Sequence, residues 1–469
     1  MRILLIRSLF VLMGLSGLAI AGLYAVGMSP TSLGANIAVG TGMGAKLACS
    51  GRFLSGFDDA RIRQDLASYS AAADWFSVDI DDQAQRARVS LMGFAGTSAT
   101  YRDGIGCTLD LGESDVLTQL MAPDAPMVDD ALGWPAGPAE PVLNETLARM
   151  LAASMAQDQA EGLETRALVL VQHGQLLAEA YAPGVTPKTR LMGWSMGKSL
   201  TALMLGWLEQ RGQLTVDEQR LFDEWSRDER ATIKLKDLLQ MTSGLDFSEV
   251  YVPGSDATRM LFMEPSAASV PLQSPLKYAP GSHFSYSSGT TNLLSLLFTQ
   301  RVGGPQQAIN HLYQDILWPL GMRDTTLEPD ASGVFVGSSN IYATARDWAR
   351  LGEAFLHKGE LNGVRIARKS YMDELVQPNA SSNDRAYGYQ VWLNRGEEAL
   401  YWPDLPDDVY GFSGNRGQSV MIFPTQQAVM VRLGWSAKNY PANDRFAEWS
   451  RAWARHGASS TGCGRNRDG

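Results

Sequence analysis

A serine and a lysine with a spacing suited to nucleophilic chemistry occur in the segment GWSMGKS, residues 193–199. Ser195 and Lys198 are three positions apart, so on a helix they lie on one face, one turn from each other. A serine hydroxyl needs an adjacent base to become a nucleophile, and an amine is a base only when it is neutral. Burial and the positive end of a helix dipole both disfavour the ammonium form and lower its pKa. The pair could therefore carry out acyl transfer if a helix holds it in a buried place.

The element that must position this pair is a helix that we expect to begin at about Ser195. It continues into the apolar run of residues 200–208, and a helix that is apolar on nearly all sides is usually buried. A Ser-x-x-Lys pattern also arises by chance, and its commoner cause is a Ser and a Lys on an exposed helix. The position directly before a buried helix favours the chemical interpretation.

Two segments downstream add to this pattern. They are LLQMTSGL at residues 238–245 and YAPGSHFSYSS at residues 278–288, which contains Tyr286 and Ser288. A tyrosine beside two serines is most often a turn residue. Tyr286 therefore gains a catalytic interpretation only when these segments are compared with a family.

Together these segments resemble the serine β-lactamase and penicillin-binding-protein superfamily. SMGK (195–198) is similar to its first signature, YSS (286–288) to its Tyr-x-Asn or Tyr-x-Ser, and LLQMTSGL to its Leu-Leu-x-His/Met-Thr-Ser-Gly-Leu stretch. In particular, the chain resembles class C-like esterases and the 6-aminohexanoate-dimer hydrolase group. The resemblance implies an α+β fold of the β-lactamase/transpeptidase type, with an antiparallel sheet flanked by helices and an all-helical subdomain.

The resemblance also implies roles for individual residues. Tyr286 would hydrogen-bond Lys198 and Ser195 and relay the proton to the leaving group. The oxyanion hole would be formed by the backbone N–H groups of Ser195 and of Asn415, or of Gln418 if the register differs. Further residues that could shape the substrate pocket are Trp194, Tyr251, Asp256, Ser288, Ser413 and Arg416.

The chain departs from the family pattern at the third signature, Lys/His-Thr/Ser-Gly. The corresponding residues are Phe412, Ser413 and Gly414. Phe412 is not a cation, so recognition of the carboxylate of a β-lactam or a D-alanyl peptide is in doubt. Arg416 could replace the missing cation, although a solvated arginine on a turn is an equal interpretation.

The N-terminus predicts export. Arg2 and Arg7 precede an uncharged stretch at residues 8–27, which has about the length that spans a bilayer core. Positive charge before such a stretch places that end in the cytoplasm and the rest of the chain outside. Two alternatives stay open: an uncleaved anchor in the inner membrane, with the catalytic domain in the periplasm, or a signal peptide cleaved near Ala21. Both place the protein in the cell envelope or beyond.

Composition excludes other classes. The net charge of -10 and the lack of a basic run argue against nucleic-acid binding. The five histidines show no metal-ligand spacing, so we predict neither a metal nor a cofactor. Cys49 and Cys107 could form a disulfide in an oxidising compartment or remain buried thiols. Cys463 lies in a polar tail that we expect to be mobile.

We expect four regions along the chain. They are the anchor or signal segment at 1–27, an accessory region at 28–140, the hydrolase domain at 141–456 and a flexible tail at 457–469. Residues 28–46 resemble a Gly/Ala/Ser-rich linker, and five prolines mark a second linker at 121–141.

Hairpins and helices are also predicted within these regions. We expect a strand at 87–91, hairpins at 167–181 and 418–433, a helix capped by Asn144 and a C-terminal helix at 444–455.

Three functions compete at this stage. An esterase or linear-amide hydrolase acting on a small molecule is the first, and a β-lactamase or D-alanyl-D-alanine peptidase is the second. The third is a non-catalytic binding protein of the envelope that keeps the fold.

Overall fold

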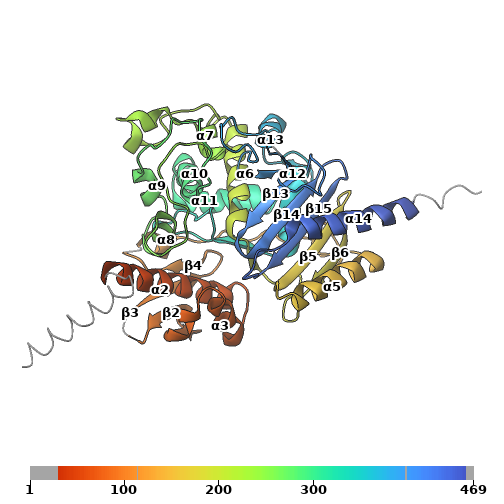
Figure 1. Cartoon of the computed structure of the whole chain (residues 1–469), viewed down its shortest axis with the longest axis horizontal. Helices are drawn as coiled ribbons and strands as arrows, with labels where there is room; N and C mark the ends of the chain where they lie inside the picture. Colours follow the sequence, from red (N-terminus) through yellow and green to blue (C-terminus); the bar gives the residue numbers. More distant parts are fainter. Residues whose placement is uncertain (1–29, 94, 113–114, 397–398, 461–469) are drawn as a thin grey trace, which may run out of the picture.

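The computed structural model describes residues 30–93, 95–112, 115–396 and 399–460 (Figure 1). Residues 145–460, which we call the main domain, are built around a six-stranded antiparallel sheet of order β12-β13-β14-β15-β5-β6. The strands are β5 (Thr165–Gln172), β6 (Gln175–Tyr181), β12 (Trp392–Leu393), β13 (Tyr410–Gly414), β14 (Gln418–Phe423) and β15 (Ala428–Gly434). The two predicted hairpins are confirmed, and β15 pairs with β5 to join them, with Val431 opposite Val169.

Helices cover both faces of this sheet. α5 (Glu145–Ala160) and α14 (Ala442–Ser460) lie on one face, and α12 (Ala345–Leu356) lies on the other. Successive side chains of a strand point to opposite faces of the sheet, so one strand can contact the helices on both faces. On β15, Met430 packs in the cluster with α5 and α14, whereas Val429 and Val431 belong to the core that contains α12. Asn144 caps α5 as predicted, and α14 runs past residue 456, where we expected the domain to end.

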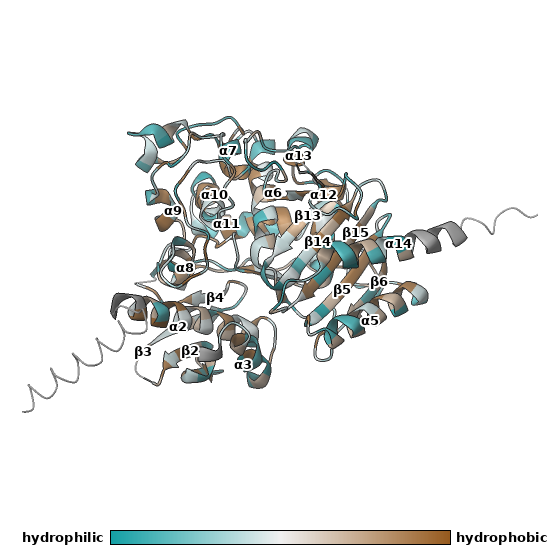
Figure 2. Ribbon diagram, viewed as in Figure 1, coloured by the Kyte–Doolittle hydropathy of each residue, from teal (hydrophilic) through white to brown (hydrophobic). Residues whose placement is uncertain are grey.

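Beside the sheet lies the predicted helical subdomain. Its helices are α6 (Gly197–Gln210), η3 (Asp223–Trp225), η4 (Glu229–Thr232), α7 (Leu235–Leu239), α8 (Asp256–Phe262), α9 (Ser269–Gln273), α10 (Ser288–Arg301), α11 (Pro305–His311) and η5 (Leu312–Leu317). α6 runs through its centre, and every side chain from Lys198 to Leu208 is buried. Apolar residues concentrate in this helix and in the adjoining strands (Figure 2).

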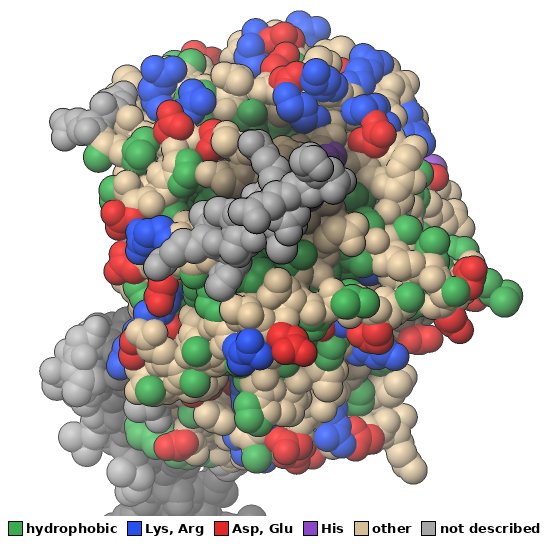
Figure 3. Space-filling model, turned by 90° about the vertical axis from the view of Figure 1, so that its right-hand side faces the viewer, with side chains coloured by type: hydrophobic (Ala, Val, Ile, Leu, Met, Phe, Trp, Pro, Cys, Tyr) green, Lys and Arg blue, Asp and Glu red, His purple; other side chains and the backbone are tan. Residues whose placement is uncertain are grey.

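Short elements complete the main domain. They are β7 (Leu191–Met192), β8 (Thr325–Leu327) and β9 (Ile341–Ala343), which form a sheet of order β7-β9-β8, the hairpin β10 (Glu360–Leu361) and β11 (Val364–Arg365), and the helix α13 (Lys369–Leu375). On the face drawn in Figure 3, acidic and basic side chains intermingle, with hydrophobic side chains between them.

Residues 30–109, which we call the accessory unit, pack a helix against a four-stranded antiparallel meander. The elements are α2 (Pro30–Phe53), α3 (Asp59–Ala67), η1 (Ala71–Trp75), β1 (Phe76–Asp81), β2 (Arg86–Leu91), β3 (Ala95–Arg102) and β4 (Gly106–Leu109). The predicted strand at 87–91 is β2. The accessory unit is followed by α4 (Asp115–Gln119) and by a stretch without helix or strand that reaches Asn144.

The predicted linker at residues 28–46 is wrong, because α2 occupies most of it. The glycines that suggested a linker instead allow close packing. A Cβ at Gly42 would lie 2.5 Å from the carbonyl oxygen of Phe262, and one at Gly44 would lie 3.0 Å from the side chain of Val89. Helix α2 can therefore lie directly between the meander and α8. Such packing outweighs the low helix propensity of glycine.

A disulfide stabilises the accessory unit internally, and a buried ion pair attaches it to the main domain. Cys49 on α2 and Cys107 on β4 form a disulfide. Lys46 forms an ion pair with Glu328 of the main domain, and both side chains are buried. Glu328 also accepts hydrogen bonds from Ser50 Oγ (2.9 Å) and from the Cys107 amide (2.6 Å). Burial raises the pKa of Glu328 and lowers that of Lys46, and the opposite charge of the partner acts against both shifts.

The predicted membrane segment at residues 8–27, like Cys463, lies outside the described residues. Among the helices of residues 30–460 that the structure describes, none is long and apolar enough to cross a membrane.

Replacement of Glu328 should test the buried ion pair. Glu328→Leu leaves the Lys46 ammonium buried without its partner, which should lower the free energy of unfolding by about 3–5 kcal/mol in urea denaturation. The double variant Glu328→Leu with Lys46→Met removes both charges and should lose less. Asp82→Asn breaks the exposed pair with Arg52 and should have little effect. Equal losses in the single and double variants would contradict this account.

Candidate active site

Ser195 lies in a short 3₁₀ turn (η2, Trp194–Met196) that leads from β7 directly into α6. Trp194 adopts a left-handed conformation, with φ +50°, just before the serine. The Ser195 side chain is partly exposed, whereas Lys198, one turn further on, is completely buried. The predicted position of the pair, at the start of a buried helix, is confirmed. A substrate can therefore approach the hydroxyl while the amine stays away from solvent.

Three oxygens surround the Lys198 amine. Its Nζ lies 3.0 Å from Ser195 Oγ, 3.0 Å from Ser288 Oγ and 3.0 Å from the carbonyl oxygen of Ser338. Burial lowers the pKa of Lys198 to about 8, although the charge of Glu249 opposes this shift. About a tenth of the amine is therefore neutral at pH 7, far more than for an ordinary lysine, and the neutral amine can accept the proton of Ser195.

Glu249 is the site residue that the sequence did not reveal. Its carboxylate accepts hydrogen bonds from Ser288 Oγ (2.5 Å), from the Ser288 amide (2.7 Å) and from the Tyr251 hydroxyl (2.8 Å). Ser288 Oγ thus lies between the carboxylate and Lys198. The signal in the sequence was the loop at residues 249–256, where Tyr251 and Asp256 are the predicted pocket residues. Tyr251 does contact the site, 3.3 Å from Ser288 Oγ.

The aromatic ring of Tyr286 lies beside the Lys198 amine. The Lys198 Nζ is 5.0 Å from the centroid of its ring, and the ring stacks on Trp392 at 5.4 Å with an interplanar angle of 21°. Trp392 stacks in turn on Tyr401 at 5.0 Å. Burial raises the pKa of Tyr286, and a side-chain hydrogen bond with Ser195 acts in the opposite direction. The phenol is therefore held in its protonated form beside Ser195.

The end of strand β13, near the edge of the main sheet, borders the site next to Ser195. β12 pairs only with Tyr410 and Gly411, so the end of β13 extends past it. A Cβ at Gly414 would lie 2.3 Å from the carbonyl oxygen of Gly193, which places this end of β13 directly against the turn that carries Ser195. Ser413 is partly exposed there, and Asn415 is exposed.

The side chains of two predicted residues, Gln418 and Asp256, bind backbone groups of the protein. Gln418 is buried, and its side chain exchanges two hydrogen bonds with the backbone of Gly434. Asp256 accepts a hydrogen bond from the Ser248 amide at 2.9 Å and lies at the start of α8. Both stay predictions: Gln418 as an oxyanion donor through its backbone N–H, and Asp256 as a binding residue.

The two positions where a carboxylate-binding cation was considered, Phe412 and Arg416, do not form a carboxylate-binding site. Phe412 is buried and packs edge-on against Phe355 of α12 at 4.7 Å. Arg416 donates to the carbonyl oxygen of Ser68 at 3.1 Å and lies over the ring of Tyr69. Its guanidinium is thus bound to the accessory unit. Throughout the described part of the chain, no group of three His, Cys, Asp or Glu side chains is arranged to hold a metal ion.

Comparisons with known proteins agree with this arrangement. A model of the Beta-lactamase family matches residues 147–455. The 6-aminohexanoate-dimer hydrolase of Paenarthrobacter ureafaciens is 25% identical over 321 residues, which cover 64% of this chain and 79% of that protein. A penicillin-binding protein homologue from Caulobacter crescentus has a similar solved structure, with a TM-score of 0.53 at 19% identity, over 67% of this chain and 99% of that one. For a family VIII carboxylesterase the TM-score is 0.53 at 15% identity, over 66% and 98%.

The fold and the matched residues define a hydrolase of the serine β-lactamase and penicillin-binding-protein superfamily. Within that class, the chain belongs to the Beta-lactamase family. The predicted resemblance and fold class are confirmed. The accessory unit lies outside the matched residues and is an addition to the family domain.

The charge of Glu249, which acts on Lys198 across Ser288, predicts a pH effect. If neutral Lys198 is the base, kcat/KM rises with pH through an apparent pKa of about 8. The negative charge of Glu249 raises that pKa, so Glu249→Gln should lower it and move the acidic limb to lower pH.

The measurement is the pH profile of p-nitrophenyl ester hydrolysis. Asp246→Asn is the matched control, because it removes an exposed carboxylate that pairs with Lys277 in the same segment of the chain. Its profile should be unchanged. An acidic limb that stays in place or moves to higher pH in Glu249→Gln would contradict the prediction.

Proposed function

We propose that the protein cleaves an ester or amide bond through an acyl-enzyme on Ser195. The observation that carries this proposal is the buried Lys198 amine, 3.0 Å from Ser195 Oγ, with a pKa lowered to about 8. A buried lysine of this kind can activate a serine without a histidine. The partial exposure of Ser195 supports the same conclusion, since the substrate must reach its hydroxyl.

Each step has a group to perform it. Neutral Lys198 accepts the Ser195 proton as Oγ bonds to the substrate carbonyl carbon. When the tetrahedral intermediate collapses, the bond to the leaving group breaks, and the protonated phenol of Tyr286 donates to that group while Lys198 returns a proton to Tyr286. Water then attacks the acyl-enzyme, its proton passes to the same pair, and Ser195 Oγ leaves with a proton.

The developing oxyanion needs donors on the opposite side from Lys198. We assign this role to the backbone N–H groups of Ser195 and Asn415. The close approach of Gly414 to Gly193 supports this assignment, because it brings the two backbone segments together. Gln418 is the less favoured alternative, since it pairs with Gly414 in the β13–β14 ladder.

The residues at the end of β13 favour a substrate that has no carboxylate group to be bound there. Phe412 faces the core, and the Arg416 guanidinium is bound by Ser68 and Tyr69. An ester or a linear amide therefore suits the site better than a β-lactam or a D-alanyl peptide. The names of two similar proteins, a 6-aminohexanoate-dimer hydrolase and a carboxylesterase, support the same class.

The proposal includes a place in the cell envelope. The Cys49–Cys107 disulfide supports an oxidising compartment, and the first 27 residues have the pattern of an export segment. Recovery of the full chain in a cytosolic fraction with both thiols free would contradict this location.

Replacement of Ser195 and Lys198 tests the mechanism. Ser195→Ala should abolish labelling by a fluorophosphonate, detected as intact mass, and Lys198→Met should lower kcat/KM for p-nitrophenyl esters by about 10²–10⁴-fold. Penicillin should give little adduct with the wild-type protein.

Ser199→Ala is the matched control. Ser199 is a buried serine on the same helix whose hydroxyl donates to the Gln390 carbonyl oxygen at 2.7 Å. This variant should label at the wild-type stoichiometry. Labelling that persists in Ser195→Ala would refute the assignment of the nucleophile. Labelling that is absent from the wild-type protein would instead favour the non-catalytic binding protein.

A further inference from the structure

The accessory unit meets the main domain directly behind the proposed oxyanion hole. The contact is made by the end of α3 and the residues that follow it, Ser68 and Tyr69. They face the turn before Ser195 and the end of β13. Because the family match begins at residue 147, this contact is a feature that the family domain does not supply.

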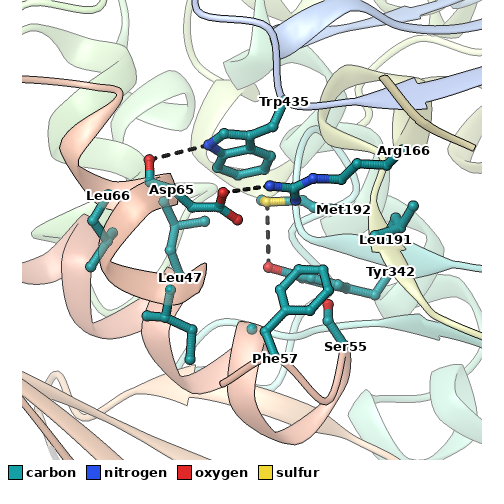
Figure 4. Close-up of a pocket in the computed structure, with 12 residues that line it drawn as sticks. Leu47, Ser55, Phe57, Asp65, Leu66, Arg166, Leu191, Met192, Tyr342 and Trp435 are labelled. Atoms are coloured by element: carbon teal, nitrogen blue, oxygen red, sulfur yellow. Dashed lines mark hydrogen bonds and ion pairs between the residues drawn. The ribbon is translucent and has the colours of Figure 1, made fainter. Parts of the chain in front are cut away.

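Buried polar contacts fix this junction, as Figure 4 shows. The carboxylate of Asp65 forms an ion pair with Arg166 of β5. The indole Nε1 of Trp435 donates to the Asp65 carbonyl oxygen and to Ser68 Oγ, both at 3.1 Å. The Arg166 guanidinium lies 5.1 Å from the centroid of the Trp435 ring. Since these groups are desolvated, a shift of α3 would leave several of them without partners.

Tyr69 touches both segments of the proposed oxyanion hole. The guanidinium of Arg416 lies 3.7 Å from the centroid of its ring. The ring of Trp194 meets it edge-on at 6.4 Å, with an interplanar angle of 64°. Arg416 is further held by its hydrogen bond to the carbonyl oxygen of Ser68. The Tyr69 ring of the accessory unit therefore packs against both backbone segments of the proposed oxyanion hole, through Trp194 and Arg416.

The two residues that rest on Tyr69 are both in the left-handed region. Trp194 has φ +50° and Arg416 has φ +64°. For residues other than glycine such a conformation is strained and persists only where the surroundings hold it. Trp194 directly precedes Ser195, and Arg416 directly follows Asn415. The backbone strain therefore lies beside the two amides that are assigned to the oxyanion.

We propose that Tyr69 is a positioning residue that aligns the Ser195 and Asn415 amides through Trp194 and Arg416. The accessory unit is then part of the active-site framework, although it contacts no reacting atom. This inference rests on the proposed function, because it takes Ser195 as the nucleophile. A misplacement of about 1 Å in such a site can cost on the order of 10²-fold in rate.

The test is carried out on the full chain with Tyr69→Ala. Oxyanion donors act in the transition state, so their displacement lowers kcat and kcat/KM together and leaves KM nearly unchanged. We expect kcat for p-nitrophenyl esters to fall by about 10- to 100-fold, with a parallel fall in the rate of fluorophosphonate labelling. Tyr69→Phe keeps the ring and should restore both rates to within about twofold of the wild type.

Phe57→Ala is the matched control for loosening of the same junction. Phe57 is buried there, and the guanidinium groups of Arg166 and Arg61 lie 5.2 Å and 5.8 Å from the centroid of its ring. It should lower the thermal midpoint, as Tyr69→Ala does, but leave kcat unchanged. Tyr69→Leu, which keeps apolar volume without an aromatic face, replaces Tyr69→Ala if the latter does not fold.

The outcomes separate this inference from the proposed function. Wild-type labelling at Ser195 together with an unchanged kcat in Tyr69→Ala, or an equal loss in Phe57→Ala, would overturn the role of Tyr69 alone. An increase in KM with kcat unchanged would also overturn it, since it would indicate a substrate contact. Absence of labelling at Ser195 in the wild-type protein would overturn both.

Discussion

The structure depends on the burial of one amine. Lys198 is completely buried on α6, and its Nζ is within hydrogen-bond distance of two serine hydroxyls and a backbone carbonyl. A buried ammonium group is costly unless such partners surround it, so burial lowers the pKa and leaves the amine available as a base. The segments that contain Ser288 and Ser338 must therefore pack against α6, and the helical subdomain brings them there.

A balance between desolvation and the charge of Glu249 sets how much of the Lys198 amine is neutral. Glu249 holds Ser288 through two hydrogen bonds and raises the pKa of Lys198, whereas desolvation lowers it. Tyr286 is fixed between the amine and Trp392, so its phenol stays close to Ser195. The same arrangement of a perturbed amine, a carboxylate and a protonated phenol is what proton transfer at a serine requires. The accessory unit adds a further constraint, since its Tyr69 packs against the strained residues on either side of the site.

Much of the main domain follows from local patterns. The hairpins at 165–181 and 418–434 and the helix capped by Asn144 repeat the periods and capping residues of the sequence. The prediction of a linker at 28–46 was wrong because glycine has two opposite effects on helices. It breaks isolated helices, but it also lets a helix approach neighbouring backbone, as Gly42 does at Phe262. Which use applies depends on what packs there, and local sequence does not contain that information.

By itself, the sequence determined the Ser195–Lys198 pair, because residues three apart on a helix meet without any help from distant segments. It also indicated Tyr286 through the likeness of its segment to a family. Only the tertiary structure brought Glu249 to Ser288 and placed the Arg416 guanidinium over the ring of Tyr69. These contacts join residues tens to hundreds of positions apart. Their partners are chosen by packing and by the need to pair buried charge, and neither leaves a periodic mark in the chain.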